Sequence, residues 1–589
     1  MSGDKGPSQA TALVSLARAA FDLVVSEDAR PYGVRRNGPN IAMPLRGKAG
    51  LRAELARRFT DANGGNVPSQ SALADAMTVL EGIAAATDPI PVHLRVAGDA
   101  ELVVIDLGTA DGRCVIAEPD GWHVAERAPV LFRRSGAMSP MPEPIRDDVG
   151  FAHLRDLLNM DDTTFHQLVA WLVAAWIPHI PHPVLTFKGE QGTGKSKAAQ
   201  LVIGLVDASP ATKRSQPRDV KTWATQAFNS WALCLDNVST IPPWLSDTLC
   251  KAVTGDGIID RALYTDDDVV VLTFRRVLAM TTIDAGAFAG DLAERLLMLD
   301  LQLIEEHHRR SEEDLDRTYA TARPNVLAAL LDLLCEVLRV LPDVRLERMP
   351  RMADYARVLA AVDTVQGWNT LDNYVASSQR VAADALEGDP FGSAVAHFIE
   401  THGAWTGTTA HLLDLIPPPE THHPKWPKDA TRAGGQLRRL APLFRSIGIT
   451  YDDTARSSDR HRHRLITLTC PEIVRKTASN ASTASVTPAD LPLPTDTTVR
   501  ASVHTEGGQR PQNTDADATY TAPDTAATAV SEVLDGVDQG KHGSPDTAGP
   551  VDAGMRSISG YYLLCATCGD PVDPADTAAG HLTHPGCAP

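Results

Sequence analysis

Apolar positions at helical and strand spacing organise the first part of the chain. Residues 10–30 and 69–86 place apolar side chains three and four positions apart, which predicts two amphipathic helices. Between residues 91 and 134, short apolar runs are bounded by Gly, Asp or Pro, which is typical of strands. We expect an N-terminal α+β domain over residues 1–140, closed by a proline-rich linker, and we assign it no function.

The next part alternates between apolar runs of strand length and of helix length. Residues 150–345 are therefore predicted to form an α/β domain with a mostly parallel sheet and helices on both faces. The expected helices cover residues 165–177, 195–206 and 324–341, and the expected strands cover residues 184–187, 231–235, 269–274, 277–283 and 296–301. A helical connector over residues 346–390 follows, with a helix at 352–365.

Three further segments follow the connector. Residues 391–476 show three helical stretches and then a β pair, which is the order of a winged helix. Residues 477–558 are dominated by Thr, Ala, Asp, Pro and Gly, with few large apolar side chains, so we expect a disordered linker. Aromatic and cysteine residues return over residues 561–589, which we expect to form a small separate module.

Composition narrows the class of protein. Hydrophobic residues make up 43% of the 589 positions, enough for several cores, and the formal net charge of −19 argues against a protein that coats DNA through overall positive charge. The N-terminus shows no signal-like apolar stretch, and the most apolar run, residues 168–177, is too short to span a bilayer. We therefore expect a cytoplasmic protein without a membrane partner, whose five scattered cysteines are reduced core thiols.

Residues 189–196 read Gly-Glu-Gln-Gly-Thr-Gly-Lys-Ser, a complete phosphate-binding loop between a predicted strand and a predicted helix. The candidate nucleotide-binding residues are Gly189, Glu190, Gln191, Gly192, Thr193, Gly194, Lys195 and Ser196. Glycines let backbone amides approach phosphate oxygens, Lys195 neutralises the β- and γ-phosphates, and the Ser196 hydroxyl is a Mg²⁺ ligand. The motif predicts ATP and Mg²⁺ as cofactors. The alternative is a glycine turn that binds no nucleotide.

An acid at the end of a second buried strand would complete such a site. Asp236 ends the run at residues 231–235 and is the candidate for the metal's water shell, although it could also be a plain strand-end residue. The next position is Asn237, whose amide can align water but cannot accept its proton at neutral pH. Either Asp247 or Asp256 acts as the base instead, or hydrolysis is slow.

Two further positions are candidates for sensing or stabilising the γ-phosphate. Thr281 or Thr282, at the end of the strand 277–283, could sense it, or could simply end the strand. Arg295 could reach the nucleotide of a neighbouring subunit, or could form an ion pair with Asp291 or Glu294. We assign catalytic roles to Lys195, Asp236, Thr282 and Arg295.

Four segments together resemble the superfamily 3 helicases, specifically the D5-like primase–helicases of phages and plasmids. They are Phe187–Ser196 with the phosphate loop, Leu235-Asp-Asn237, Val253-Thr-Gly-Asp-Gly257 with Ile259-Asp-Arg261-Ala-Leu-Tyr264, and Asp291-Leu-Ala-Glu-Arg295. The resemblance covers residues 150–345 and implies an AAA+-like P-loop core, a homo-oligomeric ring and translocation on single-stranded DNA. It also implies that Arg261, Arg275 and Arg276 contact DNA phosphates near a hairpin. For Arg275 and Arg276, a charged turn between two strands is an equal alternative.

The C-terminal part adds two candidate sites. Arg438 and Arg439 lie on the last predicted helix of the winged helix and are candidates for DNA backbone contacts, or else belong to a solvated helix face. Cys565, Cys568, His584 and Cys587 have the spacing of a Cys₃His zinc site, with His581 as a substitute for His584. A loose cysteine-bearing tail is the alternative.

These expectations favour an ATP-dependent, helicase-like replication protein of a phage or mobile element that acts on single-stranded DNA. The alternative is a nucleotide-dependent switch or loader that binds ATP, hydrolyses it poorly and recruits other replication proteins. A small-molecule kinase is disfavoured, because no lid or acceptor pocket is recognisable in the sequence.

Overall fold

The computed structural model describes residues 7–47, 50–261, 269–283, 290–418, 423, 426–457, 463–470, 556–558 and 562–564. The chain divides into two units, Met1–Ala489 and Asp490–Pro589. In the second unit, β20 (Arg556–Ile558) pairs antiparallel with β21 (Tyr562–Leu564). β20 consists of the last three residues of the segment that we predicted to be a disordered linker, and the rest of that segment lies outside the described residues.

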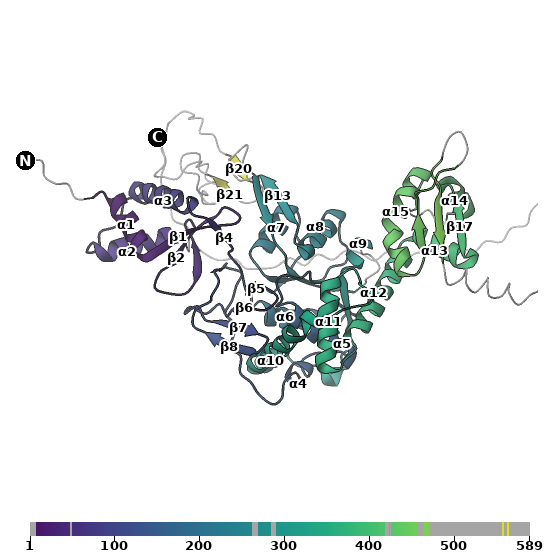
Figure 1. Cartoon of the computed structure of the whole chain (residues 1–589), viewed down its shortest axis with the longest axis horizontal. Helices are drawn as coiled ribbons and strands as arrows, with labels where there is room; N and C mark the ends of the chain where they lie inside the picture. The colour runs from purple at the N-terminus through teal and green to yellow at the C-terminus, as the bar shows by residue number, and fades with distance from the viewer. Residues whose placement is uncertain are drawn as a thin grey trace, which may run out of the picture. The chain divides into compact units, whose positions relative to one another are not determined.

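Three helices and a five-stranded sheet form the N-terminal part (Figure 1). The helices are α1 (Gln9–Ala20), α2 (Leu51–Ala62) and α3 (Gln70–Ala85). The sheet has the order β4-β1-β2-β3-β9, with β1 (Phe21–Ser26), β2 (Pro31–Arg35), β3 (Ile41–Pro44), β4 (Pro89–Ile90) and β9 (Phe132–Arg133). The predicted helix at residues 10–30 was therefore wrong in its second half, because the alternating burial of Phe21, Leu23 and Val25 belongs to a strand.

A second, four-stranded antiparallel sheet follows in the chain. Its strands are β5 (Val96–Gly98), β6 (Val103–Asp106), β7 (Cys114–Glu118) and β8 (Gly121–Ala125), paired in sequence order. Apolar residues of one face, including Val103 and Ile105, belong to the same hydrophobic core as the helices and strands beyond residue 150, whereas Val104 and Cys114 belong to a separate cluster. The core therefore does not follow the boundary that we expected at residue 140.

Arg95 connects this sheet to the following domain. Its side chain is fully buried, and its Nε donates to Oδ1 of Asp207 at 2.9 Å. The other guanidinium N–H groups donate to the carbonyl oxygens of Asp106, Ser139 and Ala208. The second carboxylate oxygen of Asp207 accepts the backbone N–H groups of Trp231 and Ala232. Both buried charges are thus paired and hydrogen-bonded, as burial requires.

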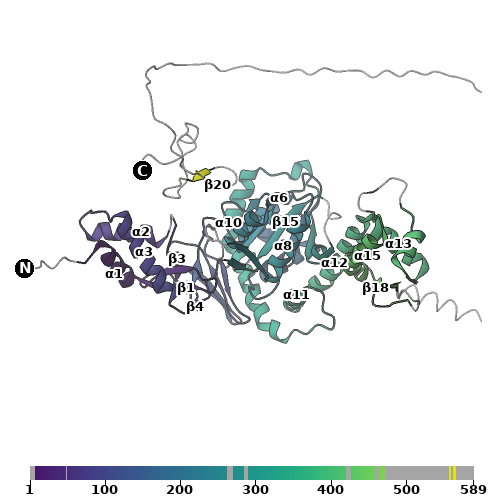
Figure 2. The ribbon, with the colours of Figure 1, turned by 90° about the horizontal axis from the view of Figure 1, so that it is seen from above.

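The central sheet is five-stranded and entirely parallel, with the order β11-β12-β15-β10-β16. Its strands are β10 (Val184–Lys188), β11 (Lys213–Arg214), β12 (Ala232–Leu235), β15 (Val277–Thr282) and β16 (Leu296–Asp300). Helix α6 (Lys195–Val206) packs across β10, β12 and β15 (Figure 2), and α5 (Asp162–Ala174) packs against β16. The mixed α/β class is as predicted.

One predicted strand of the parallel sheet lies elsewhere. β14 (Val269–Thr273) pairs antiparallel with β13 (Gly257–Arg261) in a separate two-stranded sheet. Its apolar composition fits a buried parallel strand and a hairpin strand equally well, which is why periodicity alone assigned it wrongly. The remaining helices of this part are α7 (Val220–Phe228), α8 (Pro243–Thr254) and α9 (Gly290–Ala293).

Long helices follow the sheet. α10 (Glu312–Val340) starts twelve residues before Pro324, at which we predicted the helix to begin, and Pro324 lies inside it. α11 (Ala353–Gln366) and α12 (Thr370–Glu387) follow. The next elements are α13 (Pro390–His402), β17 (Ala404–Gly407), α14 (Thr409–Leu415), α15 (Ala430–Ser446), β18 (Thr450–Asp452) and β19 (Ile466–Thr469). The three strands form one antiparallel sheet in the order β17-β19-β18. Among the described residues, no helix combines the length and apolar character needed to cross a bilayer.

Candidate nucleotide site

The glycine loop connects β10 to α6 at the edge of the sheet where all five parallel strands end. Gly192 and Gly194 have φ angles of 90° and 81°, which L side chains rarely adopt. At Gly189 a Cβ atom would lie 2.7 Å from Oγ1 of Thr193 and 3.1 Å from the carbonyl oxygen of Leu301. No side chain caps the first turn of α6, so its N–H groups remain available to an anion.

Lys195 is folded back onto this loop. Its Nζ donates to the carbonyl oxygens of Gly189 at 2.7 Å and of Glu190 at 2.6 Å. Burial lowers the pKa of the Lys195 ammonium, and the nearby carboxylate of Asp236 opposes that shift. The ammonium is thus held at the glycine loop, close enough to the acid of β12 to interact with it electrostatically.

Four polar groups from three elements meet beside the loop. Oγ of Ser196 donates to Oδ1 of Asp236 at 2.8 Å, and Oγ1 of Thr281 donates to the same oxygen at 2.7 Å. The backbone N–H of Asn237 in turn donates to Oγ1 of Thr281 at 2.7 Å. Because β15 lies between β10 and β12, Asp236 reaches Ser196 across one intervening strand, on which Thr281 stands.

Thr282, the residue that we predicted to be catalytic, is buried at the end of β15 next to Thr281. Successive side chains of a strand point to opposite faces, so only one of the two threonines can face Asp236, and Thr281 does so. Asn237 is exposed and has a φ of 56°, a left-handed conformation that asparagine tolerates better than most residues. The alternative acids Asp247 and Asp256 are both exposed.

Arg295 forms the ion pair that we considered as its alternative role. Its Nη1 lies 2.7 Å from Oδ2 of Asp291, and its side chain is only 12% exposed. Arg351, which sequence analysis did not single out, pairs with both Asp291 and Glu294 and is 38% exposed. Nothing in this network frees Arg295 for a neighbouring subunit, so its catalytic role stays a prediction.

The three arginines predicted near a DNA hairpin lie in different environments. Arg261 is the last residue of β13 and pairs in register with Val269, and residues 262–268 between them lie outside the described residues. Arg275 donates to the carbonyl oxygens of Pro178 and Thr254. Arg276 is 8% exposed and donates to the carbonyl oxygens of Ala227 and Arg275. This burial does not support the predicted contact of Arg276 with DNA and fits a structural turn instead.

The candidate DNA-contact residues on α15 are both exposed. Arg438 lies 3.0 Å from Oδ2 of Asp453, and Arg464 lies 3.1 Å from the same oxygen, so two guanidinium groups share one carboxylate. Arg439 stands one position further along the helix. The predicted zinc ligands Cys565, Cys568, His584 and Cys587 lie outside the described residues.

The N-terminal half of α10 supports the loop helix, and we did not predict it. Lys197 on α6 pairs with Asp316 at 2.5 Å, and the Tyr319 hydroxyl donates to the carbonyl oxygen of Leu201. A Cβ at Gly204 would lie 2.9 Å from that hydroxyl, so the two helices approach closely. The sequence does contain a signal for this helix start, because Ser311 caps the helix and is followed by the acidic first turn Glu312-Glu-Asp314.

Solved structures with detectable similarity match only weakly. The apo C-terminal region of NrS-1 is 10% identical with a TM-score of 0.34, covering 75% of this chain and 90% of that one. A JCV helicase bound to an acetamide compound is 13% identical with a TM-score of 0.20, covering 38% of this chain and 67% of that one. Likeness at this level carries no argument about this chain, and no curated protein matches it.

Two family models match the chain. The first, described as actinomycete integrative conjugative element replication protein, covers residues 152–384, and the second, the C-terminal domain of the same kind of protein, covers residues 391–485. The mobile-element part of the expected resemblance is therefore confirmed, whereas neither match names the D5-like branch of superfamily 3. Over residues 152–384 and 391–485, the chain therefore matches the family of integrative conjugative element replication proteins.

Proposed function

We propose that this replication protein binds Mg·ATP at the loop of residues 189–196 and hydrolyses it. The observation that carries the proposal is the convergence of Ser196, Asp236 and Thr281 at the carboxyl edge of the parallel sheet, beside a loop whose glycines have left-handed φ angles. Ligands of open α/β sheets bind at this edge. The residues present fit the group, since a hydroxyl and a carboxylate oxygen are the ligands that Mg²⁺ prefers.

Each residue of the site has a distinct role in this proposal. The amides of the loop and of the first turn of α6 bind the phosphate oxygens, and Lys195 exchanges its two carbonyl partners for the β- and γ-phosphates. Ser196 and Asp236 would hold Mg²⁺, which supplies charge neutralisation during phosphoryl transfer when bound. Thr281 fixes the carboxylate of Asp236 in place and aligns the Asn237 backbone through its second hydrogen bond.

We further propose that hydrolysis drives action on single-stranded DNA within a homo-oligomeric ring, alongside other replication proteins. Membership in a replication family supports this, as does the exposed position of Arg439 on α15. The order α13, β17, α14, α15, β18, β19 supports a winged helix, in which α15 would contact the DNA backbone. A zinc module at Cys565, Cys568, His584 and Cys587 remains part of the proposal.

A nucleotide-dependent switch is the second candidate, and Asn237 favours it. The position after the strand-end acid holds an amide whose backbone φ is 56°, and an amide cannot accept a proton from the attacking water. A protein with this site would bind ATP and change conformation, yet hydrolyse slowly. Recruitment of partners, rather than translocation, would then be its output.

ATP turnover with and without single-stranded DNA separates the two functions. The motor predicts turnover that rises at least about tenfold with DNA and is lost in Ser196→Ala, which retains the small side chain but not the metal ligand. The switch predicts tight ATP binding with negligible turnover under both conditions. Ser209→Ala is a matched control, because it removes a half-buried serine after α6 whose Oγ accepts the backbone N–H of Ala211. Turnover that is unaffected by Ser196→Ala would contradict both functions at this site.

A further inference from the structure

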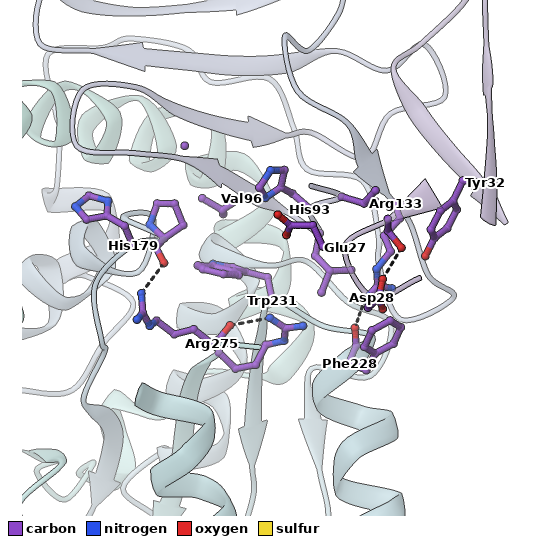
Figure 3. A pocket seen from close by; sticks show the side chains of 16 residues that line it. Glu27, Asp28, Tyr32, His93, Val96, Arg133, His179, Phe228, Trp231 and Arg275 are labelled. Carbon is purple, nitrogen blue, oxygen red and sulfur yellow. Dashed lines mark hydrogen bonds between the residues drawn. The ribbon is translucent and has the colours of Figure 1, made fainter. Parts of the chain in front are cut away.

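A cavity of about 310 Å³ lies at the opposite edge of the central sheet from the glycine loop (Figure 3). Trp231 and Arg276, which line it, directly precede β12 and β15, and His179 lies shortly before β10. The facing wall comes from the turn after β1 and from the segment around His93. The cavity is therefore separate from the nucleotide site, although the strands that start at its wall end at Asp236 and Thr281.

Three arginines contribute to the wall of this cavity: Arg133, Arg275 and Arg276. Arg133 is 9% exposed and Arg276 is 8% exposed. Within the described residues, their guanidinium groups donate to backbone carbonyls, and the acceptor of Arg133 is the carbonyl oxygen of Phe228. Within the described part of the chain, none of the three forms an ion pair with a carboxylate. Nε of Arg275 is buried and has no hydrogen-bond partner among the described residues.

Buried guanidinium groups are normally compensated by a carboxylate. Carbonyl oxygens satisfy the N–H groups but leave the net charge in place. Burial, together with the charge of Arg133, lowers the pKa of Arg276 to about 9, although the carboxylate of Asp207 opposes the shift. Of the two acids in the wall, Asp28 is paired with Arg30 at 2.9 Å, and Glu27 is exposed. Among the described residues, the three arginines of the cavity wall therefore have no carboxylate in direct contact. Asp28, Asp354 and Asp207 act on Arg133, Arg275 and Arg276 only through longer-range electrostatics.

We propose that this cavity binds a small phosphate-bearing molecule of mononucleotide size. Arginine matches the planar, multidentate geometry of phosphate oxygens, and the volume is in the range of small-ligand sites. Trp231 supplies apolar wall for the non-phosphate part, and Tyr32 supplies a hydroxyl. The ring of Phe228 is already covered by the guanidinium groups of Arg30 and Arg133. The enclosed position of Arg276 favours a free small molecule over the backbone of a DNA strand.

Calorimetric titration of the full chain with inorganic pyrophosphate tests the proposal. The titration uses the Lys195→Ala background, so that binding at the glycine loop does not contribute. We expect one site per chain, weakened at least about tenfold by Arg275→Gln, which removes a charged donor. Arg357→Gln is the matched control, because Arg357 also donates to a backbone carbonyl but lies on α11, away from the cavity. It should change the affinity less than about twofold.

Glu27→Gln provides a test that does not depend on altering a buried residue. Glu27 is exposed in the cavity wall, so its removal should leave the fold intact and tighten pyrophosphate binding about three- to tenfold. Titrations with adenosine monophosphate and with a single-stranded oligonucleotide identify the source of the phosphate. Binding of the mononucleotide that the oligonucleotide does not displace supports the proposal. Binding of the oligonucleotide alone, or pyrophosphate affinity unaffected by both Arg275→Gln and Glu27→Gln, would overturn it.

Discussion

The hydroxyl oxygen of Ser196 lies 2.8 Å from Oδ1 of Asp236, although the two residues are 40 positions apart in the chain. The contact links the first turn of α6 to the end of β12, and it gathers the two metal ligands of the proposed site. Since Thr281 donates to the same carboxylate oxygen, Asp236 is held from two sides.

Asp236→Asn should remove activity without unfolding the domain. The amide oxygen can still accept both hydroxyl hydrogen bonds, but the negative charge that would hold Mg²⁺ is lost. A metal ion contributes several kcal/mol to transition-state stabilisation, so we expect ATP turnover to fall at least about 100-fold. Asp300→Asn, at the exposed end of β16, is the control and should retain turnover. If Asp236→Asn and Asp300→Asn lost the same amount of ATP turnover, the loss would not come from a missing metal ligand.

Thr281→Val should weaken both the fold and nucleotide binding. It removes one of the two hydrogen bonds to Oδ1 of Asp236, which keeps the bond from Ser196. It also leaves the N–H of Asn237 without its acceptor, which costs about 1–3 kcal/mol where the group is shielded from water. Urea unfolding and ATP titration measure the two effects. Thr186→Val on β10 is the comparison, because this buried hydroxyl makes one long bond of 3.3 Å to the carbonyl oxygen of Val184. If Thr281→Val and Thr186→Val changed the free energy of unfolding and the ATP affinity equally, Thr281 would have no special role in the site.

Asn237, directly after Asp236, has a left-handed backbone conformation. Its φ of 56° favours asparagine or glycine, since β-carbon contacts strain other residues by about 1–2 kcal/mol. Asn237→Ala should therefore lower the free energy of unfolding by about 1 kcal/mol, whereas Asn237→Gly should change it by less. Denaturation curves of the two variants compare them directly. A stable alanine variant would show that the strained conformation does not matter.

The part of the site that follows local rules was predicted from the sequence. The glycine motif located the loop, and α6 has the predicted bounds of residues 195 and 206, because the apolar spacing starts at the motif and stops before Asp207. The strand-end position of Asp236 was also predictable. The choice between Thr281 and Thr282 was not, since it depends on which face of β15 points toward β12.

Contacts between distant segments were beyond sequence reasoning. Arg95 and Asp207 are separated by 112 residues, and nothing in either local sequence indicates their pairing. For the same reason we expected a domain boundary at residue 140, whereas the four-stranded sheet shares its core with the nucleotide-binding part. The burial of Arg276 was equally invisible, because two adjacent arginines are usually a solvated turn.

Breaking this buried ion pair should destabilise the protein strongly. Arg95→Met leaves Asp207 with a buried, uncompensated charge, which costs about 3–5 kcal/mol. The double variant Arg95→Met with Asp207→Asn should recover part of that loss, because the orphaned charge is removed. Unfolding of the wild type, both single variants and the double variant completes the cycle. Strict additivity would show that the two residues do not interact.

His182 makes the fold sensitive to acid. It is fully buried, its Nε2 donates to the carbonyl oxygens of Ala174 and Ile177, and burial lowers its pKa from 6.5 to about 4. Between these values the unfolded chain binds a proton that the native state does not, so stability falls as the pH falls. We expect this histidine alone to remove about 2 kcal/mol between about pH 7 and pH 5.

Urea unfolding at both pH values tests this sign. His182→Gln cannot titrate and should lose less stability on acidification than the wild type does, while the exposed His123→Gln should behave as the wild type. An identical acid response in the wild type and His182→Gln would show that other groups determine it.

Binding of Mg·ATP to the wild type and to Lys195→Ala, followed by calorimetry, tests the central claim most directly. Lys195 contacts the loop carbonyls and not the hydrophobic core, so the variant should fold normally. We predict one site per chain in the wild type and an affinity for Mg·ATP reduced at least about 100-fold in the variant, because the variant loses a charge-assisted contact to two phosphates. Equal affinity in the two proteins would contradict a triphosphate site at this loop.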